Sequence, residues 1–168
     1  MKAVRTIIST FLVAVSLTAT LVTAASPAQA DAASGTCAAG YRLGSYSSSI
    51  PAYNLPGQLM WKISWRKRWC YNVTSKRVGT VYAPKPTVSI YFIFGSAWRY
   101  RGIVDSDSYY TSRDARGYVH RNYPRWGHVS WHKVKMDHCA VKYAICTSHY
   151  YKVGIISYWD GSKKLILP

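Results

Sequence analysis

The sequence contains no glutamate, and its six acidic residues are all aspartates. Glutamate is a common general acid or base in enzymes and a common source of surface solubility. Every carboxylate role therefore falls to the aspartates or to the chain terminus. Asp31 lies at the expected start of the mature chain, which leaves five aspartates inside the domain. The absence of glutamate excludes mechanisms built on a glutamate base.

Long hydrophobic runs are absent beyond the first residues of the chain. Two cations, Lys2 and Arg5, precede an apolar run from Ile7 to about Val22, and residues 28–30 (Ala-Gln-Ala) form a small-x-small cleavage site. Residues 1–30 are therefore predicted to be a cleaved signal peptide. No later stretch approaches the roughly 18 apolar residues needed to cross a bilayer. We expect a secreted, extracellular protein with no transmembrane segment after signal cleavage.

Motifs for catalysis or metal binding are also missing. Glycine–serine pairs occur, but none has the flanking glycines of a hydrolase nucleophile elbow. The stretch Asp105-Ser106-Asp107-Ser108 resembles the opening of a calcium loop, yet the glycine and terminal glutamate of that loop are absent. We interpret it as a solvated turn within a polar, turn-rich segment from Asp105 to Gly117. The sequence predicts no cofactor and no metal site, and it favours a binding protein over an enzyme.

No long amphipathic helix pattern is present outside the signal, whereas period-two alternation is clear. From Leu59 to Val73 the odd positions are apolar with one exception, which predicts a strand whose tryptophans face the core. The exception is Lys67, which we interpret as a bulge, a bend or the rim of the sheet. Cations on the opposite parity give this strand one basic face.

Further segments extend the β pattern. Thr87–Phe94 is uncharged and rich in β-branched and aromatic residues, which predicts a central strand buried on both faces. Trp98–Val104 alternates aromatic residues with arginine, and Val129–Cys139 is expected to be extended. Tyr150–Trp159 is strand-like, and the hairpin signal Asp160-Gly161 lets residues 165–167 return beside it.

Several short strands separated by turns predict an all-β fold, namely a single antiparallel β-sandwich or small barrel. After the signal peptide, we divide the chain into an N-terminal segment at 31–57, tied by a disulfide, and a β domain at 58–168. The mature chain of 138 residues is long enough for one core.

All four cysteines lie in the exported part of the chain, where an even number indicates two disulfides. Three pairings are possible. We favour Cys37 with Cys70 and Cys139 with Cys146, because sequential pairing matches the two clusters of cysteines. The first bridge would hold the Ala-, Gly- and Ser-rich N-terminal segment in place.

The cationic charge is the main functional signal. Removing the two cations of the signal leaves 20 basic residues against six aspartates, a formal charge of +14. Clustered cations raise the local concentration of any anionic polymer or surface. We predict binding to an envelope polymer such as teichoic acid, to anionic lipid, or to nucleic acid. The candidate basic face consists of Lys62, Arg66, Arg68, Arg99 and Arg101.

Two alternatives remain open. His128 and His132 share one parity in an expected strand, and two imidazoles can act as general acid and base on RNA, so a secreted antimicrobial or nuclease toxin is the second hypothesis. On a regular strand these histidines would lie about 13 Å apart, too far for one zinc ion. The third hypothesis is a proteinaceous enzyme inhibitor that presents the loop from Cys139 to Cys146.

The layout of motifs resembles a known group of proteins. The layout consists of the signal peptide and four motifs: Trp69-Cys70-Tyr71, Trp98-x-Tyr100-x-Gly102, the Cys139-x6-Cys146 pair and Asp160-Gly161. In this layout the chain resembles small secreted, disulfide-containing β-rich proteins of actinobacteria, most of which have no assigned function. The resemblance implies secretion, disulfides and a β fold. It implies no catalytic residues.

Overall fold

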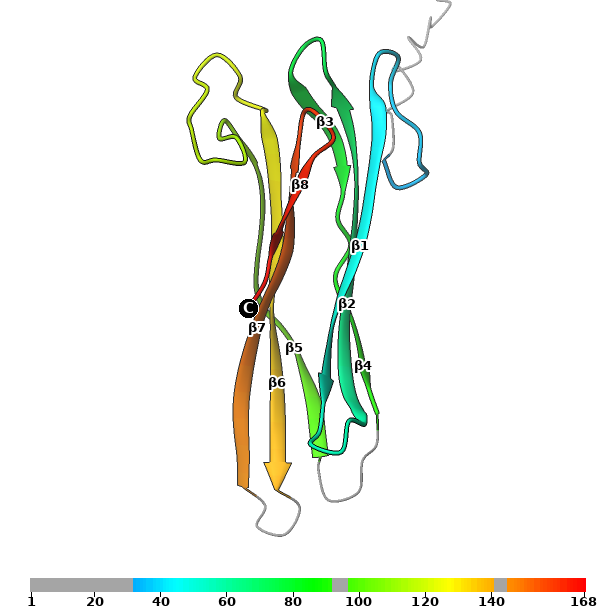
Figure 1. The fold of residues 1–168 in the computed structure, drawn as a ribbon, viewed down its shortest axis with the longest axis vertical. Coiled ribbons are helices and arrows are strands. Elements are labelled where there is room, and N and C mark those ends of the chain that lie inside the picture. Colours follow the sequence, from blue (N-terminus) through cyan, green and yellow to red (C-terminus); the bar gives the residue numbers. More distant parts are fainter. Residues whose placement is uncertain (1–31, 92–96, 141–144) are drawn as a thin grey trace, which may run out of the picture.

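The computed structural model of the chain describes residues 32–91, 97–140 and 145–168. The described chain is all-β, and two antiparallel four-stranded sheets pack face to face as a sandwich (Figure 1). The first sheet contains β1 (Arg42–Tyr53), β2 (Leu59–Asn72), β3 (Arg77–Tyr82) and β4 (Thr87–Ile90). The second contains β5 (Ala97–Thr111), β6 (Gly127–Ala140), β7 (Ile145–Tyr158) and β8 (Lys163–Ile166) in that order. The predicted β-sandwich is confirmed, while the predicted signal peptide lies outside the described residues.

Strand β2 runs through the middle of the first sheet and supplies much of the core. Its odd-numbered side chains Trp61, Ile63 and Trp65 pack between the sheets against Val134 and Met136 of β6. Burying an aliphatic or aromatic side chain of this size stabilises the fold by about 1.5–3 kcal/mol. The predicted strand and the predicted burial of its tryptophans are confirmed.

Lys67 does not mark a bulge, a bend or a rim, so our interpretation of this residue was wrong. The ladder between β1 and β2 continues through Lys67, which lies opposite Tyr46, and its only register shift falls between Ala52 and Tyr53. The side chain points into the sandwich and is 1% exposed. A lysine thus occupies a core position, for which the opposite sheet provides hydrogen-bond acceptors.

The prediction of a central strand at Thr87–Phe94 was also wrong. Strand β4 is short and lies at the edge of the first sheet, where it pairs with β2 and exposes three of its four residues. The reason is the length of β2. Strand β3 covers only its Arg68–Asn72 part, and β4 fills the remaining length on the same side from Trp61 to Ser64. Residues 92–96 lie outside the described part.

The polar segment beginning at Asp105 is not a turn up to Gly117, because β5 continues to Thr111. This strand pairs with β6 along its whole length, and the register shifts twice, once between Tyr100 and Gly102 and once between Ile103 and Asp105. Extra residues of this kind let a strand bend while it stays paired. Pairing with the long β6 overrides the low strand propensity of the Asp–Ser sequence.

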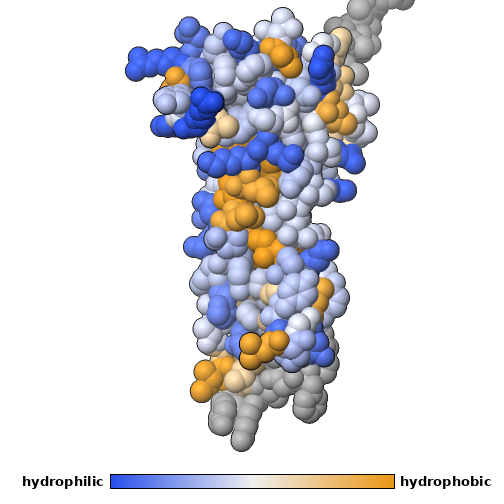
Figure 2. All heavy atoms as spheres, viewed as in Figure 1, coloured by the Kyte–Doolittle hydropathy of each residue, from blue (hydrophilic) through white to orange (hydrophobic). Residues whose placement is uncertain are grey.

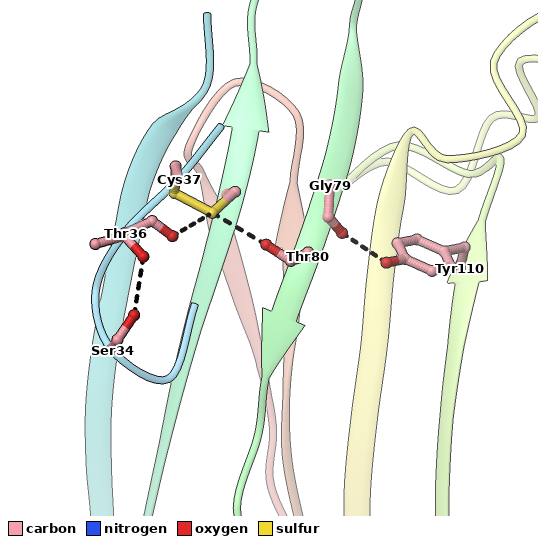
Figure 3. Close-up of a disulfide and its surroundings, with 7 residues drawn as sticks. Ser34, Thr36, Cys37, Gly79, Thr80 and Tyr110 are labelled. Carbon is pink, nitrogen blue, oxygen red and sulfur yellow. Dashed lines mark hydrogen bonds between the residues drawn. A yellow bond between two sulfur atoms is a disulfide. The ribbon is translucent and has the colours of Figure 1, made fainter. Parts of the chain in front are cut away.

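Both predicted disulfides are confirmed, Cys37–Cys70 and Cys139–Cys146. Around the first bridge, the Thr80 hydroxyl donates to Cys70 Sγ at 3.2 Å (Figure 3). The same view shows the Tyr110 hydroxyl donating to the carbonyl oxygen of Gly79 at 2.6 Å, which links β5 to β3 across the edges of the two sheets. The N-terminal segment is held by β1 pairing as well as by its disulfide.

The predicted C-terminal hairpin is present, with β7 and β8 paired from Gly154 to Ser157. Its turn is longer than two residues and spans 159–162, where Gly161 adopts a φ of +84° that glycine favours. In Figure 1, β8 and β1 lie on the same face of the molecule. Figure 2 shows apolar side chains gathered in the middle of that face, while polar side chains predominate, with a few apolar ones among them, in its upper part.

Candidate anion-binding groove

A groove with a volume of about 490 Å³ lies on the outer face of the first sheet. Its cations are Lys62 and Arg66 of β2 and Lys85, which follows β3. Lys62 and Arg66 have the parity opposite to the buried Trp61 and Ile63, and alternation therefore points them away from the core. Three positive side chains thus line one hollow.

Hydroxyl groups fill the spaces between these cations. Ser64 of β2 lies between Ser49 of β1 and Thr87 of β4 in one cross-strand row. Ser47 lies opposite Arg66 in the neighbouring row. These four residues line the groove, and so does Ser48. A hydroxyl can donate or accept a hydrogen bond, so the row can satisfy phosphate oxygens that the cations attract.

Lys85 enters the groove because of the connection between β3 and β4. The two strands pair one after the other with the same side of β2, and the intervening residues Ala83-Pro84-Lys85-Pro86 span the gap between them. Proline fixes its own φ and restricts the residue before it, which reduces the freedom of this short connection. Pro86 is buried while Lys85 is exposed. The lysine is therefore presented at the groove by an anchored segment.

The first sheet carries no acidic residue. The chain from 42 to 90 contains eight Lys or Arg residues and no aspartate. The five aspartates of the domain all follow residue 97, namely Asp105, Asp107, Asp114, Asp137 and Asp160. A hollow lined by charge of one sign concentrates anions. The cations of the groove have no carboxylate partner within their own sheet.

Arg68, a third predicted binding residue on β2, is partly buried and already bonded within the protein. Its guanidinium donates to the carbonyl oxygen of Ala33 at 2.8 Å and so helps to hold the N-terminal segment. Arg66 is exposed, and its guanidinium lies 5.8 Å from the centre of the Tyr82 ring. Of the predicted residues on this strand, Lys62 and Arg66 line the groove and Arg68 lies beside it.

The structure does not bring Arg99 and Arg101 to this groove. Both belong to β5 of the second sheet, where the neighbouring Trp98 packs toward the core. Arg101 Nε donates to Asp137 Oδ2 at 2.6 Å. Hydrogen bonds from Ser148 and Arg101 lower the pKa of Asp137, so the carboxylate is charged and offsets the arginine. The five predicted cations thus lie on two sheets rather than on one face.

The outer face of the second sheet carries cations that sequence reasoning missed. Lys133 and Lys135 of β6 approach the ring of Tyr150, and Lys152 of β7 lies 3.8 Å from the centre of the Trp131 ring. The alternation of Lys133 and Lys135 with Val134 and Met136 could have revealed the two cations on β6. These ammonium groups contact aromatic faces and share their sheet with aspartates, unlike the cations of the groove.

A separate polar cluster lies inside the sandwich around Lys67. Its Nζ donates to the carbonyl oxygens of His128 at 2.6 Å and Ile155 at 2.8 Å, on β6 and β7. The Ser157 hydroxyl donates to the same oxygen of His128 at 3.3 Å, and the Ser130 hydroxyl donates to that of Ile155 at 3.4 Å. Burial lowers the pKa of Lys67 to about 7. Burial thus favours the neutral amine relative to a lysine in water.

His128 and His132 both point into the sandwich. His128 is 5% exposed, and its Nε2 lies 3.4 Å from the Ser108 hydroxyl. Burial, followed by the charge of Lys67, lowers the pKa of His128 to about 3. Burial and then the charge of Lys85 lower the pKa of His132. Both shifts favour the neutral imidazole, the form that accepts a proton rather than donating one in general acid–base catalysis.

His132 lines a cavity of about 280 Å³ together with three serines, Ser106, Ser108 and Ser130. In the described residues, no three histidine, cysteine or aspartate side chains come close enough to hold a metal ion. The same part of the chain has no helix long and apolar enough to cross a membrane.

Comparisons of the chain with protein-family models, with curated proteins and with solved structures give no match.

Proposed function

We propose that this protein is a secreted, non-enzymatic binding protein for a phosphate-rich anionic polymer of the cell-envelope type. The observation that carries the proposal is the groove, where Lys62, Arg66 and Lys85 converge on a sheet without any carboxylate. Secretion is supported by the signal-like N-terminus and by two disulfides, which persist in oxidising compartments.

The shape and lining of the groove favour a polymer over a bilayer or a nucleic acid. A hollow can enclose a chain of phosphates, whereas a flat lipid surface would meet only its rim. Single-stranded nucleic acids bind most proteins through bases stacked on aromatic side chains. Among the described residues, the only aromatic side chain that lines the groove is Trp65, which is 6% exposed. Hydroxyls between cations instead match a polymer that alternates phosphate with polyol.

The test compares two variants that remove the same charge from different sheets. The groove variant is Lys62→Gln, Arg66→Gln and Lys85→Gln, and the matched control is Lys133→Gln, Lys135→Gln and Lys152→Gln. The probe is immobilised poly(glycerol phosphate), and binding is measured at fixed salt. At roughly 1 kcal/mol for each cation at an anionic surface, the groove variant loses about a hundredfold in affinity. The control loses far less.

Equal losses in the two variants would show that net charge alone controls binding and would contradict the proposed site. Vesicles of anionic lipid and single-stranded RNA serve as competing probes. Tighter binding of either one than of the phosphate polymer contradicts the proposed partner. Cleavage of the RNA would favour the nuclease alternative and contradict a purely binding role.

A further inference from the structure

A second cavity, of about 260 Å³, lies at one end of the second sheet and is unrelated to the groove. It is lined by the turn at 114–118, between β5 and β6, and by residues 158–162, where β7 ends and turns toward β8. Both connections lie at the same end of the sandwich (Figure 1). The volume is slightly below the roughly 300–1,000 Å³ of sites that take drug-sized ligands. It offers room for one small ring.

Aromatic side chains build a rigid wall for this cavity. Trp126 and Trp159 line it, with ring centres 5.0 Å apart in an edge-to-face contact. His120 stacks on Trp126 at 4.0 Å, and Trp159 donates its backbone N–H to the carbonyl oxygen of Trp126. Tyr118 also lines the cavity and is 67% exposed, so its ring is accessible from solvent.

Polar groups of both signs complete the lining. Asp114 is fixed by three hydrogen bonds, because its Oδ1 accepts from the backbone N–H groups of Arg116 and Tyr118 and its Oδ2 contacts His120 Nε2 at 3.1 Å. The bond to His120 is the main reason that the pKa of Asp114 is lowered, so the carboxylate is ionised at neutral pH. Arg116 itself also faces the cavity.

The opposite turn contributes a second carboxylate and a hydroxyl. Asp160 Oδ1 accepts hydrogen bonds from the backbone N–H and the hydroxyl of Ser162, at 2.9 and 2.6 Å. These bonds fix the orientation of the carboxylate within the turn. Both residues line the cavity. Donors and acceptors thus surround an aromatic wall.

The charges of the lining select a class of ligand. An anion would meet two carboxylates, and a cation would meet Arg116 and also Lys76, whose Nζ lies 5.9 Å from the centres of the Trp126 and Trp159 rings. A neutral molecule that has one apolar face and several hydroxyls is repelled neither by the carboxylates nor by the cations. Its apolar face can lie against an aromatic ring while carboxylate and guanidinium groups bond its hydroxyls.

We propose that the cavity between Tyr118, Trp159 and Asp160 binds a single neutral saccharide unit. The site is independent of the groove, since the two share no lining residue. Loss of saccharide binding would therefore leave phosphate-polymer binding intact, and the reverse also holds. A polymer that carries sugar substituents could engage both sites.

The test titrates the purified protein with glucose, galactose, mannose and N-acetylglucosamine, and follows backbone amide shifts by NMR. At least one sugar is expected to give saturable shifts confined to 114–118 and 158–162. Tyr118→Ala, at a largely exposed position, is expected to weaken binding about fivefold through lost stacking. Asp160→Asn keeps an oxygen acceptor for Ser162 but loses the charge, and is expected to weaken binding about tenfold.

The control variant is Tyr53→Ala, which removes a tyrosine that is 57% exposed at the end of β1, away from the cavity. It is expected to bind the sugar with unchanged affinity. The proposal is overturned if none of the four sugars gives saturable shifts, or if the affinity is the same in both cavity variants and the control. It is likewise overturned if tetramethylammonium or inorganic phosphate shifts the same amides and the sugars do not.

Discussion

The two faces of β2 carry the same kind of side chain in opposite settings. On the outer face, Lys62 and Arg66 line a hollow that contains no carboxylate. On the inner face, Lys67 is 1% exposed and donates to two carbonyl oxygens of the other sheet. Because neighbouring residues of a strand face opposite sides of the sheet, Arg66 is available to a ligand whereas the next residue, Lys67, is buried in the fold.

The comparison shows why a count of cations is a poor guide to a binding surface. Burial lowers the pKa of Lys67 to about 7, which means that the charged form costs free energy inside the sandwich. The inner face of β2 also divides along its length. Trp61 and Ile63 pack in an apolar region, whereas Lys67 packs beside His128 and Ser157 in a polar one.

The largest expected effect separates packing on the inner face from charge on the outer face. Ile63 is fully buried in the core, so Ile63→Ala is expected to lower the free energy of unfolding by about 2–5 kcal/mol. Polymer affinity of the folded protein is expected to stay unchanged. Lys62→Ala is the matched outer substitution, expected to change stability by no more than about 0.5 kcal/mol while weakening binding.

Denaturant unfolding and polymer binding, measured on both variants, check this expectation. A stability loss in Lys62→Ala as large as that in Ile63→Ala would show that the two faces of β2 are not functionally distinct.

The next effect concerns the enclosed amine. The pKa of Lys67 is about 7 in the folded state against an ordinary value of 10.5. Between these values the unfolded chain binds a proton that the folded chain lacks, so the free energy of unfolding rises with pH. The rise amounts to about 2 kcal/mol from pH 7 to pH 9. Well below pH 7 the amine is protonated in both states, so Lys67 no longer makes the free energy of unfolding change with pH.

Lys67→Met is expected to abolish that rise, because methionine fills a similar volume and does not titrate. Other groups that titrate in this range are common to both proteins, so the difference between the two pH profiles isolates Lys67. Parallel profiles for Lys67→Met and the wild type would mean that the amine remains charged throughout, held by its two carbonyl acceptors.

Much of the fold could be predicted from local pattern. Period-two alternation located β2 and its buried tryptophans, and the turn at Asp160-Gly161 located the β7–β8 hairpin. The disulfide pairing followed from the two sequence clusters of cysteine. These features depend on residues close together in the chain or on one strand alone.

Features that depend on long-range pairing could not be predicted. The role of Lys67 requires carbonyl oxygens 61 and 88 residues away. The edge position of β4 depends on the length that β3 leaves uncovered on β2, which composition does not reveal. The groove is the same kind of case, because Lys85 reaches it only through the connection between β3 and β4. Only Lys62 and Arg66 of its cations were predicted as binding residues.

The most direct test of the proposed groove is the salt dependence of polymer binding. Each phosphate contact releases counterions, and the logarithm of affinity falls with the logarithm of salt concentration in proportion to the number of contacts. In the variant Lys62→Gln, Arg66→Gln and Lys85→Gln, the slope of log affinity against log salt is expected to be shallower than in the wild type by about 2–3. The control variant at Lys133, Lys135 and Lys152 is expected to keep the wild-type slope. Equal slopes in the wild type and the groove variant would contradict the assignment of the binding site to the outer face of β2.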